Sequence, residues 1–143
     1  ETSDRMPNKE EILSALPRFT GEIDQTPPKF SEVRVKGKRA YKLAREGEEF
    51  ELKSKKVTVH KLELLQHKLE FSQFLIECSS GTYIRSLIAD LGRELGSCAT
   101  TDLLSREFIG PFKVSSSLPS VQISKESVQR GIIPIDKLSE YGL

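Results

Sequence analysis

The feature that most constrains this 143-residue chain is an apolar stripe between Ile84 and Leu95. Aliphatic residues recur there at the three- and four-residue spacing of one helix face, at Ile84, Leu87, Ile88, Leu91 and Leu95. Just before the stripe, an alternating apolar run ends at Cys78, and a small-residue turn with Gly81 follows. The pattern predicts a strand, a turn and a buried helix that stops at Gly96, within a fold of the α+β class.

Tyr83 and Arg85 stand at this junction between strand and helix. A rigid strand and helix hold such side chains at fixed places, which is how many functional sites are built. Arg85 falls in the first helical turn, where the helix macrodipole disfavours a cation, so an anionic partner from elsewhere in the fold is expected. The alternative is an ordinary surface arginine, because structural ion pairs are common.

A second feature is a local concentration of positive charge. The twelve positions from 34 to 45 hold six basic residues and no acid, namely Arg34, Lys36, Lys38, Arg39, Lys42 and Arg45. We expect a strand at 30–35, a turn at 36–39 and a helix at 38–46 that ends at Gly47. Such local charge favours a polyanion as partner. The alternative is a solvated surface whose lysine stems cover apolar area.

The remaining chain predicts further elements. Asn8 and Glu11 have the spacing of a capping box, so a helix is expected at about 8–17. The segment 21–28 is expected to be a loop or an edge strand, and 50–52 a short strand. Residues 57–78 predict a long antiparallel hairpin with one phase shift in each strand and a turn at 66–68. Short helices are expected at 99–104 and 121–129.

Composition excludes several classes of protein. The chain is 36% hydrophobic and 30% charged, as in a soluble globular domain, and it has no apolar run long enough to span a membrane. We expect no signal peptide. Two cysteines, Cys78 and Cys98, are too few for a disulfide framework, so a reducing, cytoplasmic setting is expected. His60 and His67 have no partners at metal-ligand spacing. From the residues alone, a nucleic-acid-binding module is the best prediction.

Two long segments are more specific. Residues 27–47 read PPKFSEVRVKGKRAYKLAREG, and residues 80–87 read SGTYIRSL, followed by DLG at 90–92 and LG at 95–96. The first resembles the segment PPxxSAxKxxGxxxYxxAREG of the bacterial TruB-type tRNA pseudouridine-55 synthases, and the second resembles their motif GTYIRxLxxDLGxxLG. LLSR at 103–106 and GPF at 110–112 fit the family's continuation LxRxxxGxF. The resemblance runs from about residue 18 to residue 112.

This resemblance implies a pseudouridine-synthase-type fold, a largely antiparallel mixed sheet flanked by helices. It implies isomerisation of a uridine in the T-loop of tRNA without cofactor or metal, after the base has left its stack. Arg85 would pair with the catalytic aspartate, a role that suits a planar guanidinium. Tyr83 and Leu104 match positions that line the pocket for the flipped base. The six basic residues would bind the backbone of the T-arm.

The sequence also departs from the family pattern. The catalytic aspartate of the family lies in a motif like GxLDPxAxG before the PP segment, and this sequence has no such motif. We therefore expect residues 1–118 to be the C-terminal half of a catalytic domain, with a basic insertion at about 27–47. Residues 119–143 would be a connector, and the missing N-terminal half would be a partner. This chain alone is expected to be inactive.

Two alternatives remain open at this point. One is a non-catalytic RNA-binding or chaperone module derived from such an enzyme. The other is a scaffold that pairs with a separate aspartate-bearing subunit, for which an unpaired sheet edge would be the physical sign.

Overall fold

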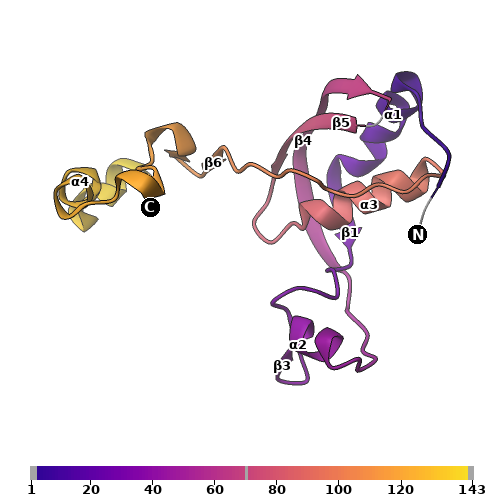
Figure 1. Cartoon of the computed structure of the whole chain (residues 1–143), viewed down its shortest axis with the longest axis horizontal. Coiled ribbons are helices and arrows are strands. Elements are labelled where there is room, and N and C mark those ends of the chain that lie inside the picture. The colour runs from indigo at the N-terminus through magenta and orange to yellow at the C-terminus, as the bar shows by residue number, and fades with distance from the viewer. Residues whose placement is uncertain (1–2, 70, 142–143) are drawn as a thin grey trace. The chain divides into compact units, whose positions relative to one another are not determined.

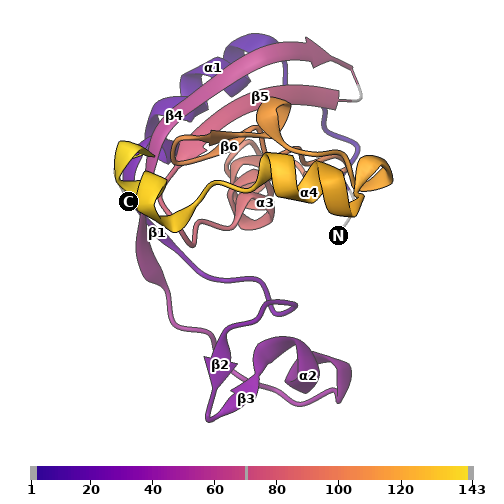
Figure 2. The same cartoon turned by 90° about the vertical axis from the view of Figure 1, so that its left-hand side faces the viewer.

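The computed structural model describes residues 3–69 and 71–141. The chain forms two compact units, and the boundary along the chain lies between Asp102 and Leu103. The first unit contains, in chain order, α1 (Lys9–Ala15), the 3-10 helix η1 (Leu16–Phe19), β1 (Gly21–Gln25), β2 (Arg34–Val35), β3 (Lys38–Arg39), α2 (Ala40–Arg45), β4 (Lys55–Lys68), β5 (Phe71–Cys78) and α3 (Ile84–Glu94). Figure 1 shows these elements, and Figure 2 shows them after a quarter turn.

Helix α1 begins at the predicted capping box. The side chain of Asn8 accepts a hydrogen bond from the Glu11 N–H (2.9 Å), and the Glu11 carboxylate accepts one from the Asn8 N–H (2.8 Å). Two of the free N–H groups at the start of the helix are thereby satisfied. The chain tightens into η1 at Pro17, because proline cannot continue the α-helical hydrogen-bond ladder. The predicted first helix is confirmed.

Strands β1, β4 and β5 form an antiparallel sheet in that order, so the segment at 21–25 is an edge strand. The phase shift predicted for the first strand is confirmed on β4, where the register shifts between Val59 and Lys61. The second shift, predicted for the partner strand, also lies on β4, between Leu64 and Gln66. Each extra residue restores the phase of the alternation. The predicted turn at 66–68 is wrong, since these residues continue β4 and pair with Phe71, Ser72 and Gln73.

One face of this sheet is covered by helices. Ile12 and Leu16 form the core with Leu91, and the partly buried Leu62 and Phe74 of the sheet pack against them. Leu87 is 1% exposed, so the stripe predicted for α3 is indeed the buried face. Helix α3 ends in a Schellman motif at Gly96 (φ +65°), where the Ser97 N–H donates to the Gly92 carbonyl at 2.9 Å.

The opposite face of the sheet is polar. Lys56 pairs with Glu22 at 2.5 Å, and Lys61 pairs with Glu63 at 2.7 Å. Each glutamate raises the pKa of its lysine partner, chiefly by accepting a hydrogen bond from the ammonium and then through its negative charge. Apolar residues on the covered face and charged residues on the opposite face are typical of an antiparallel sheet with one solvated side.

Residues 26–54, between β1 and β4, form what we call the basic module. Its two ends are joined by a hydrogen bond between the Thr26 and Ser54 hydroxyls (2.8 Å). Strands β2 and β3 make a hairpin whose turn residues, Lys36 and Gly37, have φ of +49° and +86°. Helix α2 ends in a second Schellman motif at Gly47 (φ +72°). The predicted helix is confirmed, but the predicted turn at 36–39 is confined to Lys36 and Gly37, because Lys38 and Arg39 pair with β2.

The strands predicted at 30–35 and 50–52 are largely wrong. Only Arg34 and Val35 pair as a strand, and 50–52 has no regular structure. The Ser31 and Val33 carbonyls instead accept hydrogen bonds from the N–H groups of Tyr41 (3.1 Å) and Ala40 (2.7 Å). These backbone groups therefore cap the start of α2 and are not available to a neighbouring strand.

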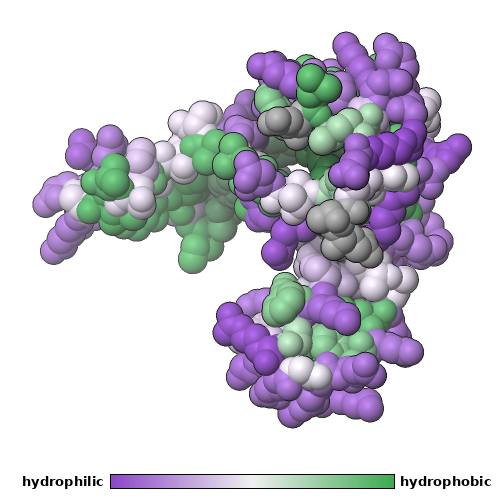
Figure 3. Space-filling model, turned by 45° about the vertical axis from the view of Figure 1, so that its right-hand side comes forward, coloured by the Kyte–Doolittle hydropathy of each residue, from purple (hydrophilic) through white to green (hydrophobic). Residues whose placement is uncertain are grey.

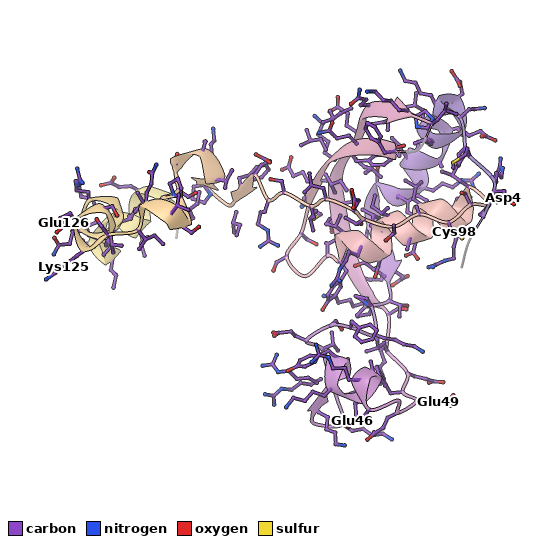
Figure 4. The ribbon with its side chains drawn as sticks, viewed as in Figure 1. Asp4, Glu46, Glu49, Cys98, Lys125 and Glu126 are labelled. Carbon is purple, nitrogen blue, oxygen red and sulfur yellow. The ribbon has the colours of Figure 1, made fainter. Side chains whose placement is uncertain are left out.

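The second unit contains β6 (Phe108–Ile109), β7 (Phe112–Lys113), the 3-10 helices η2 (Val114–Ser116), η3 (Ser120–Gln122) and η4 (Ile135–Tyr141), and α4 (Lys125–Gly131). The predicted helix at 121–129 begins four residues late because Ser124 caps it, accepting from the Ser127 N–H at 3.1 Å. Lys125 and Glu126 open α4 (Figure 4), and hydrogen bonds from its own backbone and from Ser124 lower the pKa of Glu126.

No residue of this unit whose burial is described is buried, and Figure 3 shows apolar side chains at the surface. The helix predicted at 99–104 is wrong. Residues 99–104 have no helical structure, and Ala99 lies so close to Gly92 that a Cβ on Gly92 would come within 2.7 Å of it. No described helix is long and apolar enough to cross a membrane.

Candidate functional site

The turn between β5 and α3 is fixed to the neighbouring strand by hydrogen bonds. The Ser79 N–H donates to the Thr58 carbonyl (2.8 Å), and the Ser79 hydroxyl accepts from the Thr58 N–H (2.9 Å). The Thr82 hydroxyl donates back to the Ser79 carbonyl (2.9 Å). Gly81 has φ of +78°, a conformation that residues with a Cβ rarely adopt. The backbone that carries Tyr83 and Arg85 is therefore well defined.

Tyr83 is the N-cap residue of α3, but its side chain caps nothing. Its backbone is held instead by Gln25, the last residue of β1. The Gln25 side chain accepts from the Tyr83 N–H (2.7 Å) and donates to the Tyr83 carbonyl (3.1 Å). Gln25 is 1% exposed. The Tyr83 ring lies under the ammonium of Lys55, with 5.3 Å between the Lys55 nitrogen and the ring centroid.

Arg85 lies in the first turn of α3 and is exposed. No carboxylate of the described residues forms an ion pair with it. The anionic partner predicted for Arg85 is therefore not found within the described part of the chain. The next residue, Ser86, donates from its hydroxyl to the Thr26 carbonyl (3.2 Å) and so ties α3 to the start of the basic module.

Leu104, the third residue assigned to the pocket, belongs to the second unit and is 58% exposed. Tyr83 and Arg85 thus both lie in the first unit, and the role of Leu104 stays a prediction.

The six cations of the basic module fall into two groups. Lys38 contacts Glu48 (3.2 Å) and Glu46 (3.7 Å), and Arg39 contacts Glu32 (2.8 Å). The hydrogen bond that Lys38 donates to Glu48 and the charges of both glutamates raise the pKa of Lys38. Figure 4 labels Glu46 and Glu49 beside the end of α2. Acids that follow the basic run in sequence therefore fold back onto part of it.

The other four cations, Arg34, Lys36, Lys42 and Arg45, form no ion pair with any described residue. All four are exposed, and the Arg45 guanidinium lies 5.8 Å from the centre of the Tyr41 ring. A group of free cations on one small module is suited to contact phosphates.

The residues considered for metal or redox chemistry lie apart. No group of three His, Cys, Asp or Glu side chains among the described residues is arranged to hold a metal ion. The His67 ring bonds instead to the Ser72 hydroxyl (2.9 Å). Cys78 is partly buried and Cys98, just after α3, is exposed, and both are free thiols (Figure 4).

The sequence interpretation missed Gln25 and Lys55. A signal for Gln25 was present, because it stands two residues after Ile23 on the same side of β1, directly before the chain leaves the sheet at Pro27-Pro28. A polar residue at an inward-facing strand position needs a buried partner. Lys55 carries no comparable signal.

The chain was compared with known proteins. Residues 1–84 match the model described as "TruB family pseudouridylate synthase (N terminal domain)". The chain belongs to the TruB family. The matched residues include the basic module and Tyr83 and end at Ile84, one residue before Arg85.

Curated TruB-family relatives extend the similarity. The chain is 41% identical to the tRNA pseudouridine synthase B of Clostridium tetani over 93% of its own length and 46% of that protein. It is 43% identical to the protein of the same name from Bradyrhizobium diazoefficiens over 85% of its length and 36% of that protein. The chain thus spans less than half the length of these relatives.

A solved structure is also similar to the TruB-family chain. The present chain superposes with a TM-score of 0.72 and 25% identity on a chain from the crystal structure of a Cbf5–Nop10–Gar1 complex. The match covers 98% of the present chain and 41% of the chain in the complex. The α+β architecture predicted from the sequence is confirmed.

Proposed function

We propose that the protein containing this chain isomerises a uridine to pseudouridine at position 55, in the T-loop of tRNA. The observation that carries the proposal is the 41% identity, over 93% of this chain, to a relative named tRNA pseudouridine synthase B. The reaction breaks the glycosidic C–N bond, turns the uracil and forms a C–C bond through its C5. The hydrogen on C5 leaves to solvent, while the former glycosidic nitrogen gains one.

In this proposal Arg85 pairs with a catalytic aspartate from the N-terminal half of the domain, which these 143 residues do not include. Support comes from the exposed guanidinium, which no carboxylate of the described residues neutralises. A bidentate contact would orient that aspartate and keep it ionised. Tyr83 and Leu104 would line the pocket of the flipped base. This chain without the aspartate is expected to be inactive.

The basic module would bind the backbone of the tRNA T-arm. Structured RNA is recognised largely through phosphates, 2′-hydroxyls and shape, which suits exposed lysines and arginines on a small module. We assign the larger share of this binding to Arg34, Lys36, Lys42 and Arg45, because their charges are not already neutralised by glutamates. The two free thiols fit a reducing, cytoplasmic setting.

The test uses the complete protein and an unmodified tRNA transcript tritiated at C5 of its uridines. Release of tritium to water reports the reaction, and a transcript with cytidine at position 55 is the control. We expect release from the first transcript alone. Tight tRNA binding without release by the complete protein would overturn the enzyme proposal in favour of a non-catalytic RNA-binding module.

Arg85→Lys in the complete protein tests the role of the arginine. The variant keeps the charge but loses the planar fork, so turnover should fall far more than tRNA affinity. Arg93→Lys on the same helix is a matched control, since Arg93 pairs with Asp90 at the surface. An equal loss of turnover and affinity would make Arg85 a binding residue instead.

A further inference from the structure

The last residue pair of the β1–β4 ladder meets Tyr83 from two directions. Gln25 and Lys55 are direct partners in the antiparallel register, so their side chains leave the sheet on the same side. The Gln25 amide bonds to the backbone of Tyr83, and the Lys55 ammonium lies over its ring. Tyr83 is 58 positions from Gln25 in the chain, so this arrangement depends on the tertiary fold.

The side-chain amide of Gln25 forms the backbone hydrogen bonds that a neighbouring strand would otherwise form with Tyr83. By accepting from the Tyr83 N–H and donating to the Tyr83 carbonyl, it forms both bonds that a neighbouring strand would form. Tyr83 thereby stays extended (φ −97°, ψ 100°) just before α3 begins. A buried amide with both groups bonded fixes its partner, because losing either bond leaves a buried polar group unsatisfied.

Tyrosine is a poor choice for capping a helix, since it lacks the short side-chain acceptor of Ser, Thr, Asp or Asn. The α3 N-terminus accordingly has no side-chain cap. Helix stability therefore does not explain a tyrosine here, whereas a role for its ring does.

Lys55 restrains that ring. Lys55 is half-buried as a residue, and its ammonium forms no ion pair with a described residue and lies within the range of a cation–π contact with Tyr83. It also lies 2.6 Å from the place where a Cβ on residue 81 would stand. A side chain at residue 81 would therefore displace the Lys55 ammonium from this position.

We propose that Gln25 and Lys55 are positioning residues for Tyr83, Gln25 fixing its backbone and Lys55 its ring. The inference rests on the proposed function, in which Tyr83 lines the pocket of the flipped base. Gln25 directly precedes Thr26, where the basic module begins, and the Thr26 carbonyl accepts from Ser86. The same few residues thus join the start of the basic module to the junction that carries Tyr83 and Arg85.

The experiment measures single-turnover isomerisation at saturating complete protein, together with the Kd for tRNA. Gln25→Met keeps the volume but loses both hydrogen bonds, and the rate should fall roughly 10- to 100-fold, as misplaced groups do. The Kd should change by less than about twofold, because binding and turnover respond to different contacts. Gln25→Glu keeps the acceptor but not the donor and should give an intermediate rate.

Lys55→Gln removes the cation, and the rate should fall about two- to fivefold, with rescue by Lys55→Arg. A change in Kd and its salt dependence, with the rate unchanged, would make Lys55 a phosphate contact and overturn its positioning role.

Val59→Ala is the control for simple destabilisation, because Val59 is fully buried and bonds to neither Tyr83 nor Gln25. If Val59→Ala and Gln25→Met lower the rate equally at equal loss of melting temperature, Gln25 is merely structural and the proposal fails. Should Gln25→Met not fold, the role of Gln25 is tested by the rate of Gln25→Glu and by hydrogen exchange of the Tyr83 amide in the unmodified protein. A lowered rate and slow exchange would support the positioning role. Fast exchange of that amide would contradict the proposed hydrogen bond from the Tyr83 N–H to Gln25. Wild-type activity is measured alongside, so failure of the proposed function is seen separately.

Discussion

The sheet with α1 and α3 and the basic module between β1 and β4 use their residues differently. In the former, Leu87 and Val59 are buried almost completely, and Lys56 and Lys61 of the outer face are paired with acids. In the basic module the buried apolar side chains are few, chiefly Ala40 and Leu43, and four cations point to solvent without acidic partners among the described residues. Hydrophobic burial stabilises the first region, whereas local turns and caps define the second.

This difference indicates that the two regions have different tasks in the proposed function, the basic module binding RNA and the sheet with its helices positioning the side chains of the site. A region with a large core holds side chains at fixed places, as Tyr83 is held. A small module rich in free cations tracks a charged backbone, whose contacts tolerate small movements. Variants in the two regions should therefore have separable effects.

The largest effect is expected for Leu87→Ala. Leu87 is 1% exposed at the centre of the α3 stripe, and truncation there should cost roughly 2–5 kcal/mol of unfolding free energy. Chemical denaturation of the complete protein measures it. Leu43 is similarly buried in the basic module, at 4% exposed, but Leu43→Ala should leave the main unfolding transition nearly unchanged. Equal losses would mean that the two regions unfold as one.

An intermediate effect is expected for the double variant Lys42→Ala with Arg45→Ala. Each lost phosphate contact should reduce the log–log salt slope of tRNA binding by roughly 0.7 to 0.9. The matched pair is Lys38→Ala with Arg39→Ala, whose charges glutamates already neutralise in part, so the slope should change less. Binding titrations across salt concentrations compare them, and a larger change in the second pair would reverse our assignment.

The smallest effect is expected for Gly47→Ala. The glycine has φ of +72° with open space around it, so the cost is the left-handed backbone alone, about 1–2 kcal/mol. The strain should appear as faster hydrogen exchange in α2, with the exchange of α3 unaffected. Ala44→Gly, inside the same helix, is the comparison for a change in helix propensity of about 1 kcal/mol. Faster exchange in α3 would contradict the independence of the two regions.

Much of this fold could be predicted from local patterns. The capping box of Asn8 and Glu11, the stripe of α3 and the bulged alternation of β4 each depend on residues close in sequence. The turn at 66–68 was mispredicted because polar residues also occupy the exposed end of a hairpin. The helix at 99–104 was mispredicted because Ala99 packs against Gly92, and tertiary packing overrides local propensity.

By itself, the sequence determined the family, the junction with Tyr83 and Arg85, and the concentration of cations, since these are written in consecutive residues. Only the tertiary structure decided which cations are neutralised by Glu32, Glu46 and Glu48, because a charge is free or paired according to its neighbours in space. It also decided that Gln25 and Lys55 hold Tyr83. Their contacts join residues far apart in the chain, and strand register and helix packing bring such residues within hydrogen-bond distance.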